Sequence, residues 1–175
     1  MKSNPKDYRL FFGLFAALLV LVSTGTSQAQ IFVANFGSGT IGEYTINGSP
    51  VNASLISDVS QAAGLAISGS DLFVTTSNFN TVGEYTTTGA TVNASLISGL
   101  NYPAGLTVSG SDLFIANSLS GTVGEYTTSG ATVQSSLISG LNQAVGITAF
   151  GSDLFVTNYA SVAFVKRVFI RLRIG

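Results

Sequence analysis

The stretch GLTVSGSDLFIANSLSGTVGEYTTSG, residues 105–130, contains two short motifs that recur along the chain. The motif GEYT begins at three glycines that are 41 residues apart, and GSDLF recurs with the same spacing. The glycines that open the two motifs are Gly42, Gly83 and Gly124, and Gly69, Gly110 and Gly151. A fixed period of this size is typical of an array of supersecondary units. The units are residues 31–71, 72–112 and 113–153, with a partial fourth at 154–161.

Each unit contains four short segments that are rich in Val, Ile, Thr, Phe and Tyr, which favour β-strands. Glycine and β-branched residues interrupt every window, which excludes helical repeats of similar length. After each GEYT motif, an X-Gly pair such as Asn47-Gly48 predicts a two-residue type I′ turn. A Gly-Ser pair such as Gly69-Ser70 predicts a type II′ turn between two other strands. The units therefore consist of antiparallel strands joined by tight turns.

Four antiparallel strands in a unit of about 40 residues describe one blade of a β-propeller. The segment GLAIS, GLTVS or GITAF is expected to form the innermost strand, followed by DLFVT, TVGEY and the outer NASLIS. The sequence predicts an all-β fold with about three and a half blades, which is an incomplete ring. It also predicts that the first blade lacks its inner strand. A β-solenoid remains an alternative, although solenoids turn through wide bends rather than tight hairpins.

The pattern of residues 105–130 resembles the NHL-type repeat and, more loosely, the propellers of the gluconolactonase and senescence-marker group. The resemblance covers residues 31 to about 159 and implies blade architecture. Exported bacterial proteins with such repeats often end in a sorting tail that contains Pro-Glu-Pro, an apolar span and basic residues. This sequence contains no such tail, and it supplies fewer than the five to eight blades that are usual in the family.

The two ends of the chain differ from the repeats. Residues 1–29 have the layout of a secretory signal peptide: a basic start, an apolar run at 10–22 and small residues before Ala29, after which we expect cleavage. Residues 162–175 carry four of the seven basic residues and lose the repeat pattern abruptly after Ser161. This break favours a change of reading frame, so that the chain is a truncated member of its family. The alternative is a deliberate basic strand that caps an edge.

The composition excludes several classes of function. The chain contains no Cys and no His, so it lacks the commonest general base and the commonest zinc ligand. Residues 31–153 carry seven acidic side chains and no basic one, which disfavours a nucleic-acid partner because phosphate contacts need Lys and Arg. No later apolar stretch is long enough to span a membrane, so we expect no membrane span in the mature chain.

Two acidic positions recur once in each unit, and we expect neither to be catalytic. The aspartates belong in hairpin turns, and the glutamates lie on the third strand, away from the channel. Equivalent carboxylates of neighbouring blades should be at least about 10 Å apart, where they would hardly influence one another. These residues are Glu43, Glu84 and Glu125, and Asp71, Asp112 and Asp153.

The more promising rim is the one opposite the tight turns, because it carries longer loops that differ among the copies. Asn35, Asn117 and Asn158 end the second strand there and are weak candidates for a binding site. The resemblance to metal-dependent lactonases implies that such asparagines could hold a hard divalent cation, but Thr76 interrupts the series. We therefore expect no catalytic, cofactor or metal residues, with calcium as a minor alternative.

The leading functional hypothesis is an exported, non-enzymatic propeller that binds an extracellular ligand or protein through the long-loop rim. The enzyme alternative is a lactonase-like or lyase-like propeller with a divalent metal, and a third is a structural protein of the cell surface or matrix. The location would be periplasmic, cell-surface or extracellular. The bare end faces predict self-association, and NAS at Asn52 and Asn93 matches a glycosylation acceptor.

Overall fold

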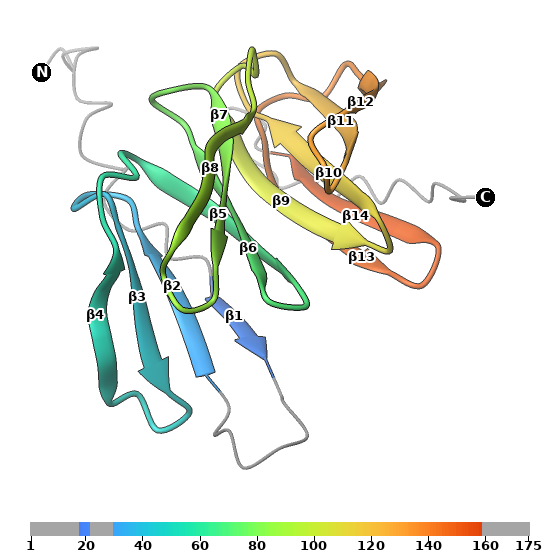
Figure 1. Ribbon diagram of the computed structural model, residues 1–175. Helices are drawn as coiled ribbons and strands as arrows, with labels where there is room; N and C mark the ends of the chain where they lie inside the picture. The colour runs from blue at the N-terminus through green and yellow to red at the C-terminus, as the bar shows by residue number, and fades with distance from the viewer. Residues whose placement is uncertain (1–17, 22–29, 159–175) are drawn as a thin grey trace, which may run out of the picture.

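The computed structural model describes residues 18–21 and 30–158 of the 175-residue chain. These residues form fourteen strands in four antiparallel sheets, and the described part of the chain contains no helix. The sheets follow one another around an arc, each turned relative to the last (Figure 1). The predicted tail at 162–175 and most of the predicted signal peptide lie outside the described residues.

Each complete sheet uses four consecutive strands in sequence order, so each is one blade. Blade 1 contains β1 (Leu18–Leu21), β2 (Gln30–Asn35), β3 (Thr40–Thr45) and β4 (Pro50–Ile56). Blade 2 contains β5 (Ala62–Ser68), β6 (Asp71–Thr76), β7 (Thr81–Thr86) and β8 (Thr91–Ile97). Blade 3 contains β9 (Pro103–Ser109), β10 (Asp112–Asn117), β11 (Thr122–Thr127) and β12 (Thr132–Ile138). Blade 4 is described as two strands, β13 (Ala144–Phe150) and β14 (Asp153–Asn158).

The order of strands in blades 2 and 3 confirms the sequence prediction. The segment that contains GLAIS is the inner strand β5, and DLFVTT, TVGEYT and TVNASLI follow as β6, β7 and β8. The outer strands are exposed along most of their length, whereas the two middle strands are largely buried. This gradient is that of a propeller blade, whose middle strands pack against neighbouring blades.

The prediction that blade 1 lacks its inner strand is wrong. Leu18–Leu21 pairs antiparallel with β2, Leu21 opposite Gln30 and Leu18 opposite Val33. Sequence comparison between units missed it because this segment lies within the apolar run 10–22 and carries no repeat motif. Cleavage after Ala29 would remove this strand and leave β2 with an open edge, since no other described strand pairs on that side.

One of the two turn predictions is also wrong. At Asn47-Gly48 only the glycine has a positive φ, of 79°, whereas a type I′ turn needs two such residues. The amide of Gly48 donates a hydrogen bond to the carbonyl of Thr45. The amide of Thr45 donates one to the carbonyl of Ser49. This is the longer hairpin in which a type I turn is followed by a glycine bulge. The predicted two-residue turn at Gly69-Ser70 agrees with the structure, since Ser68 pairs with Asp71 and only Gly69 has a positive φ.

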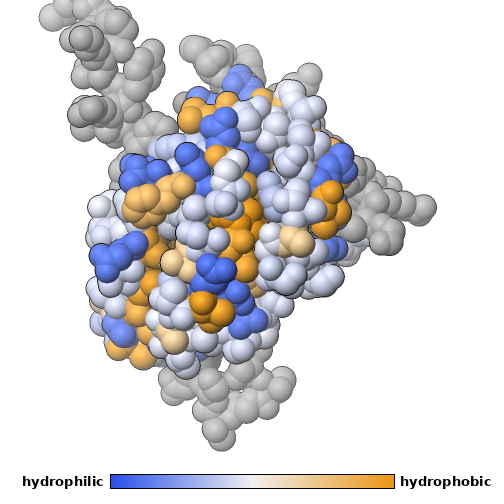
Figure 2. Space-filling view, turned by 45° about the horizontal axis from the view of Figure 1, so that its top comes forward, coloured by the Kyte–Doolittle hydropathy of each residue, from blue (hydrophilic) through white to orange (hydrophobic). Residues whose placement is uncertain are grey.

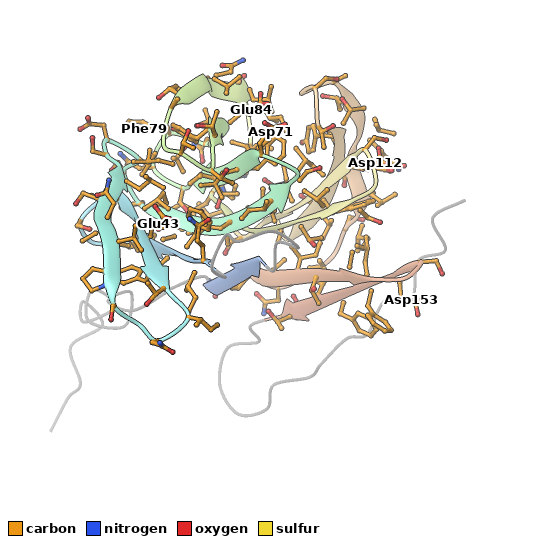
Figure 3. All side chains as sticks on the ribbon, turned by 60° about the horizontal axis from the view of Figure 1, so that its bottom comes forward. Glu43, Asp71, Phe79, Glu84, Asp112 and Asp153 are labelled. Carbon is orange, nitrogen blue, oxygen red and sulfur yellow. The ribbon has the colours of Figure 1, made fainter. Side chains whose placement is uncertain are left out.

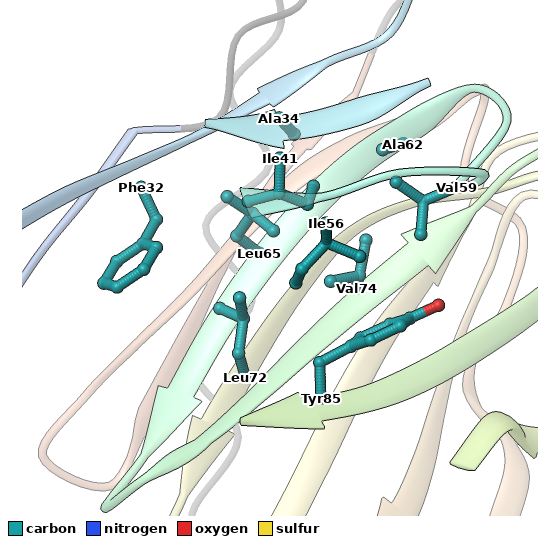
Figure 4. Close-up of a cluster of buried hydrophobic side chains, with 10 residues drawn as sticks. All are labelled: Phe32, Ala34, Ile41, Ile56, Val59, Ala62, Leu65, Leu72, Val74 and Tyr85. Carbon is teal, nitrogen blue, oxygen red and sulfur yellow. The ribbon is translucent and has the colours of Figure 1, made fainter. Parts of the chain in front are cut away.

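The hydrophobic core lies between the blades rather than within any of them. We call the face of a blade that looks toward the next blade along the chain its trailing face, and the opposite face its leading face. Between blades 1 and 2, the trailing residues Phe32 and Ile41 pack with the leading residues Leu72, Val74 and Tyr85, all buried (Figure 4). Two further clusters repeat this arrangement at the next two interfaces. Each blade is therefore stabilised mainly by its neighbours, as in other repeat proteins.

The glycine of the GEYT motif makes room for the tyrosine two residues later. A Cβ atom on Gly83 would lie 2.7 Å from Cε2 of Tyr85, which shows that the ring lies over the glycine. Gly124 and Tyr126 have the same relation, and both tyrosines are buried against the preceding blade. The motif therefore has a structural explanation: glycine permits a large aromatic side chain to lie flat on the leading face.

The candidate binding rim

The long-loop rim is formed by two kinds of loop that are tied together by backbone hydrogen bonds. The loop between the second and third strands of a blade accepts a hydrogen bond from the loop that leads to the next blade. The three equivalent bonds run from Val59 N to Gly39 O, Leu100 N to Asn80 O and Leu141 N to Gly121 O, at 3.1, 3.1 and 2.9 Å. The sequence prediction that both kinds of loop share one rim agrees with these bonds. The loops form a fixed platform on which side chains vary from copy to copy.

The three asparagine candidates stand where the sequence places them, each at the last position of the second strand. Oδ1 of Asn117 accepts a hydrogen bond from Asn101 N at 3.3 Å, and Oδ1 of Asn158 accepts one from Asn142 N at 2.8 Å. Nδ2 of Asn35 donates to Oγ1 of Thr40 at 3.2 Å. Each side chain therefore holds a strand end or a loop in place, and the three amides belong to three separate blades.

The residues just before the inner strands have an unusual backbone conformation. Gln61, Tyr102 and Gln143 occupy equivalent positions and all have a positive φ, between 51° and 55°. Non-glycine residues rarely adopt this conformation, which is found more often at binding sites and tight connections. The carbonyls of Gln61 and Tyr102 accept hydrogen bonds from Ser77 N and Ser118 N, at 3.2 and 3.1 Å, and these bonds hold the turn.

A hollow of about 400 Å³ opens on the rim of blade 1. Its walls come from both kinds of loop, and most of the side chains that line it are polar. The lining residues are Phe36, Gly37, Ser38, Gly39, Asp58, Ser60 and Gln61. A hollow of this size and lining is suited to a small polar ligand or to part of a larger one.

Three apolar side chains of the rim come from loops that touch one another. Phe79 and Leu119 lie on loops of blades 2 and 3 and are 58% and 67% exposed. Tyr102 lies between them on the connecting loop, since its amide donates to Oδ1 of Asn80 at 2.8 Å and Leu119 N donates to Asn101 O at 3.4 Å. We call Phe79, Tyr102 and Leu119 the rim patch. On the face shown in Figure 2, hydrophobic residues likewise form small groups between polar ones.

The recurring acidic residues lie toward the opposite rim, and the structure brings them together within a blade. Asp71 follows a tight turn at the start of β6 and lies close to Glu84 on β7 (Figure 3). Partial burial, and secondarily the charge of Asp71, raise the pKa of Glu84. Glu125 has a raised pKa for the same two reasons, with Asp112 as the neighbouring charge. The sequence reasoning missed these pairs because it compared equivalent positions in different blades.

In blade 1 the glutamate, Glu43, has no aspartate beside it at the position equivalent to Asp71. Gln30 occupies the place of Asp71, and its Nε2 donates a hydrogen bond to Oε1 of Glu43, which is buried.

Within the described ranges, no three carboxylates converge in a way that could hold a metal ion. A search of the same residues finds no helix long and apolar enough to cross a membrane.

Comparison with known proteins supports the fold. No family model matches the sequence, and no curated protein matches it. Among solved structures, streptogramin B lyase is 20% identical with a TM-score of 0.61, over 82% of this chain and 51% of that chain. A gluconolactonase from Xanthomonas campestris is 16% identical with a TM-score of 0.60, over 79% and 52% of the two chains. A calcium-binding protein, regucalcin, from Agrobacterium tumefaciens is 18% identical with a TM-score of 0.55, over 74% and 48%.

These likenesses show that the chain has a β-propeller fold of the kind found in gluconolactonases, streptogramin lyases and regucalcin. The chain spans about half the length of these solved structures. Together with the strand order, they favour the propeller over the solenoid. The described sheets form an open arc, in agreement with the predicted incomplete ring.

Proposed function

We propose that this protein is an exported, non-enzymatic propeller that binds an extracellular ligand through its long-loop rim. The observation that carries the proposal is the rim patch. Apolar side chains as exposed as Phe79 and Leu119 gain by being covered, and they stand on loops that hydrogen bonds already hold in place. A preformed platform binds with a small loss of conformational entropy.

The chemistry around the rim patch favours a neutral ligand with hydroxyl groups. Asn78, Asn80, Asn101 and Ser118 are the sequence neighbours of the patch residues, and amides and hydroxyls both donate and accept hydrogen bonds. Residues 31–153 carry no Lys or Arg, so nothing on the rim would offset the charge of an anionic ligand. An oligosaccharide combines hydroxyls with apolar ring faces, which an exposed Phe such as Phe79 can cover. We therefore place neutral oligosaccharides first among the ligand classes.

The second candidate is a lactonase-like or lyase-like enzyme that uses a hard divalent metal such as calcium. It is favoured by the fold, which is shared with a gluconolactonase, a lyase and a calcium-binding protein. The residues described here give it less support, because the amide oxygens of Asn117 and Asn158 are engaged by backbone amides. A structural role at the cell surface is the third candidate.

The test measures the melting temperature of the full chain with a panel of neutral oligosaccharides and, separately, with calcium. A ligand at about 100 times its dissociation constant stabilises the native state by about 2.7 kcal/mol. We expect an oligosaccharide to raise the melting temperature of the wild type but not that of a Phe79→Ser, Leu119→Ser double variant. The matched control is Val92→Ser with Val133→Ser, which changes two exposed apolar residues on outer strands.

Each alternative gives a different result in the same experiment. Equal stabilisation of the rim variant and the wild type would contradict binding at the rim patch. Stabilisation by calcium, together with hydrolysis or elimination of a lactone substrate, would favour the enzyme. An absence of any response to the panel, with no calcium effect, would favour the structural role.

A further inference from the structure

One acidic residue of the repeats, Asp58, stands apart from the other six. Those six recur every 41 residues and lie toward the rim of tight turns, whereas Asp58 is on the loop between blades 1 and 2. The amide of the next residue, Val59, donates a hydrogen bond to the carbonyl of Gly39 at 3.1 Å, which places this loop on the long-loop rim. Asp58 is therefore the only acidic side chain on the described loops of that rim.

The backbone at Asp58 has a conformation that suits glycine better. Its φ is 61°, and the equivalent residues of the next two units are Gly99 and Gly140, with φ of 74° and 75°. Glycine adopts this conformation without steric cost, whereas other residues rarely do so. The loop can therefore form without a side chain at this position. A carboxylate placed here at a conformational cost is typical of a functional site.

Asp58 lines the hollow of about 400 Å³ on blade 1. The lining also includes the hydroxyls of Ser38 and Ser60 and the amide side chain of Gln61. Phe36 adds an aromatic ring to the same lining and is partly buried. The hollow therefore combines one negative charge, several hydrogen-bonding groups and one apolar surface.

The repeats do not supply a positive partner for Asp58. Its side chain is exposed and accepts a hydrogen bond from Oγ of Ser57 at 3.3 Å. Residues 31–153 contain no Lys or Arg that could form an ion pair with it. A partner that neutralises this carboxylate can therefore come from a ligand, which would carry a positive charge.

The other groups of the hollow favour an organic ammonium ion over a metal ion. Calcium takes several oxygen ligands, usually with more than one carboxylate among them, and Asp58 is the only carboxylate in the lining. An ammonium group presents several N–H donors, which the carboxylate, a serine hydroxyl and the amide oxygen of Gln61 can accept together. The face of an aromatic ring such as Phe36 also attracts a cation.

We propose that the hollow binds an amino sugar, with Asp58 as the counter-ion of its ammonium group. Charge-assisted hydrogen bonds of this kind are stronger than neutral ones. The sugar hydroxyls pair with Ser38, Ser60 and Gln61, and an apolar ring face of the sugar covers Phe36. The proposal adds a second site with its own ligand chemistry to the long-loop rim, and it does not depend on binding at the rim patch.

The first experiment titrates the full, isotopically labelled chain with glucosamine and with glucose and follows its amide signals by nuclear magnetic resonance. The pH is 6, where an aliphatic amine carries its charge. Glucose has a hydroxyl group in place of the ammonium group and is otherwise the same sugar. We expect glucosamine to bind at least about tenfold more tightly, because only its ammonium group can pair with a carboxylate.

The second experiment repeats both titrations on variants. Asp58→Asn removes the charge and keeps the shape, so its affinity for glucosamine should fall to that for glucose. Asp112→Asn is the matched control, because it removes an equal charge near the opposite rim and should leave the affinity unchanged. Circular dichroism checks that each variant is folded. If Asp58→Asn does not fold, Asp58→Gly takes its place, since glycine occupies this position in the next two units.

The same spectra locate the site. Glucosamine should shift the amide signals of Gly37, Gly39 and Gln61 and leave those of Phe79 and Tyr102 in place. The Phe79→Ser, Leu119→Ser variant should bind glucosamine as the wild type does. The proposal for the hollow and the proposal for the rim patch can therefore fail separately.

Five results would overturn the proposal. The first is a wild-type chain that does not bind glucosamine, and the second is equal affinity for glucosamine and glucose. The third is an affinity that the Asp58 variants leave unchanged. An equal loss in Asp112→Asn would indicate attraction by the overall negative charge rather than by this site. Displacement of glucosamine by calcium at the same concentration would indicate that the hollow takes a metal ion instead.

Discussion

At the scale of single residues, the repeated motifs are explained by packing and backbone geometry. The glycine of GEYT is the space in which a buried tyrosine lies, as Gly83 and Tyr85 show. The recurring Asp begins a strand after a tight turn, and in blades 2 and 3 it comes close to the Glu of the same blade. The residues of the proposed binding rim, such as Phe79 and Tyr102, are not part of these repeated motifs.

The first prediction concerns Gly83. Alanine at this position would displace the buried ring of Tyr85, so Gly83→Ala should lower the free energy of unfolding by about 1–3 kcal/mol, as overpacked cores do. Chemical denaturation measures the change. Gly37→Ala is the control, since a Cβ atom there meets nothing within 4 Å and its φ is not positive. Equal stability of the two variants would show that the ring does not lie over the glycine.

The second prediction concerns the pH dependence that Glu84 contributes. Its pKa is raised in the folded state, so folding favours the protonated carboxyl. The contribution to stability is complete below the unfolded pKa and is lost as the pH rises through the folded pKa. Glu84→Gln should therefore stabilise the protein at pH 7, by less than about 1 kcal/mol because water screens the partly exposed pair. The gain should vanish near pH 4, as urea denaturation at both pH values can measure.

Glu43→Gln provides the control for this second prediction. The carboxylate of Glu43 accepts a hydrogen bond from Gln30 rather than facing an aspartate, so its replacement should bring no gain at pH 7. A gain of the same size in both variants would show that neither the charge of Asp71 nor the hydrogen bond from Gln30 decides the effect.

At the scale of strands and turns, most of the fold could be predicted because the 41-residue unit occurs three times. Each strand or turn assignment can therefore be compared among three copies. Strand order and the two rims follow from apolar alternation and the position of glycines. The turn at Asn47-Gly48 was mispredicted because X-Gly fits two hairpin types, and only the hydrogen bond from Gly48 to Thr45 separates them. The strand β1 was missed because an apolar run such as 10–22 satisfies the rules for both a signal peptide and a buried strand.

The candidate site was predictable only in its location. The sequence places variable loops on one rim, and Asn35, Asn117 and Asn158 at strand ends, where the structure also has them. The sequence does not reveal that the loops of Phe79 and Leu119 both bond to the connecting loop that contains Tyr102. These hydrogen bonds join separate blades, so no local sequence pattern indicates them. The exposure of Phe79 and Leu119 likewise depends on how the loops turn.

The third prediction compares two glycines of the inner strands. Gly105→Ala should lower the free energy of unfolding by about 1–3 kcal/mol, because the carbonyl of Val145 leaves no space for the methyl group. Gly146→Ala should cost less, because its Cβ atom would lie 2.9 Å from Oγ1 of Thr157, which is on an exposed side chain that can turn aside, rather than against a backbone carbonyl. Thermal unfolding at low protein concentration measures both. Similar losses in the two variants would mean that a blade already covers Gly146 in the monomer.

At the scale of the whole molecule, the described sheets form an open arc whose two end blades differ. Cores that lie between blades make every internal blade depend on two neighbours, and the end blades on one. Ile31 and Val33 of the first blade are partly exposed, whereas their equivalents Leu72 and Val74 in the second blade are buried. The long-loop rim lies at the ends of the strands and not on the faces that pack between blades.

The fourth prediction concerns export. Mass spectrometry of the exported protein should find Gln30 as the first residue, and retention of residues 10–22 would contradict the signal peptide. Because cleavage removes β1, the processed chain would lose the pairing of this strand with β2. It should therefore unfold at a lower temperature than the full chain. Thermal unfolding of both forms measures the difference.

The central claim is that the units pack as propeller blades, with the trailing face of one against the leading face of the next. The most direct test is nuclear Overhauser contacts from the ring of Tyr85. The account predicts contacts with methyl groups of Ile41, Ile56 and Val59, which share its buried cluster. In a solenoid, equivalent residues of successive units stack, so the ring of Tyr85 would contact that of Tyr44. Contacts between these two tyrosines, without those to Ile41 and Ile56, would contradict the account.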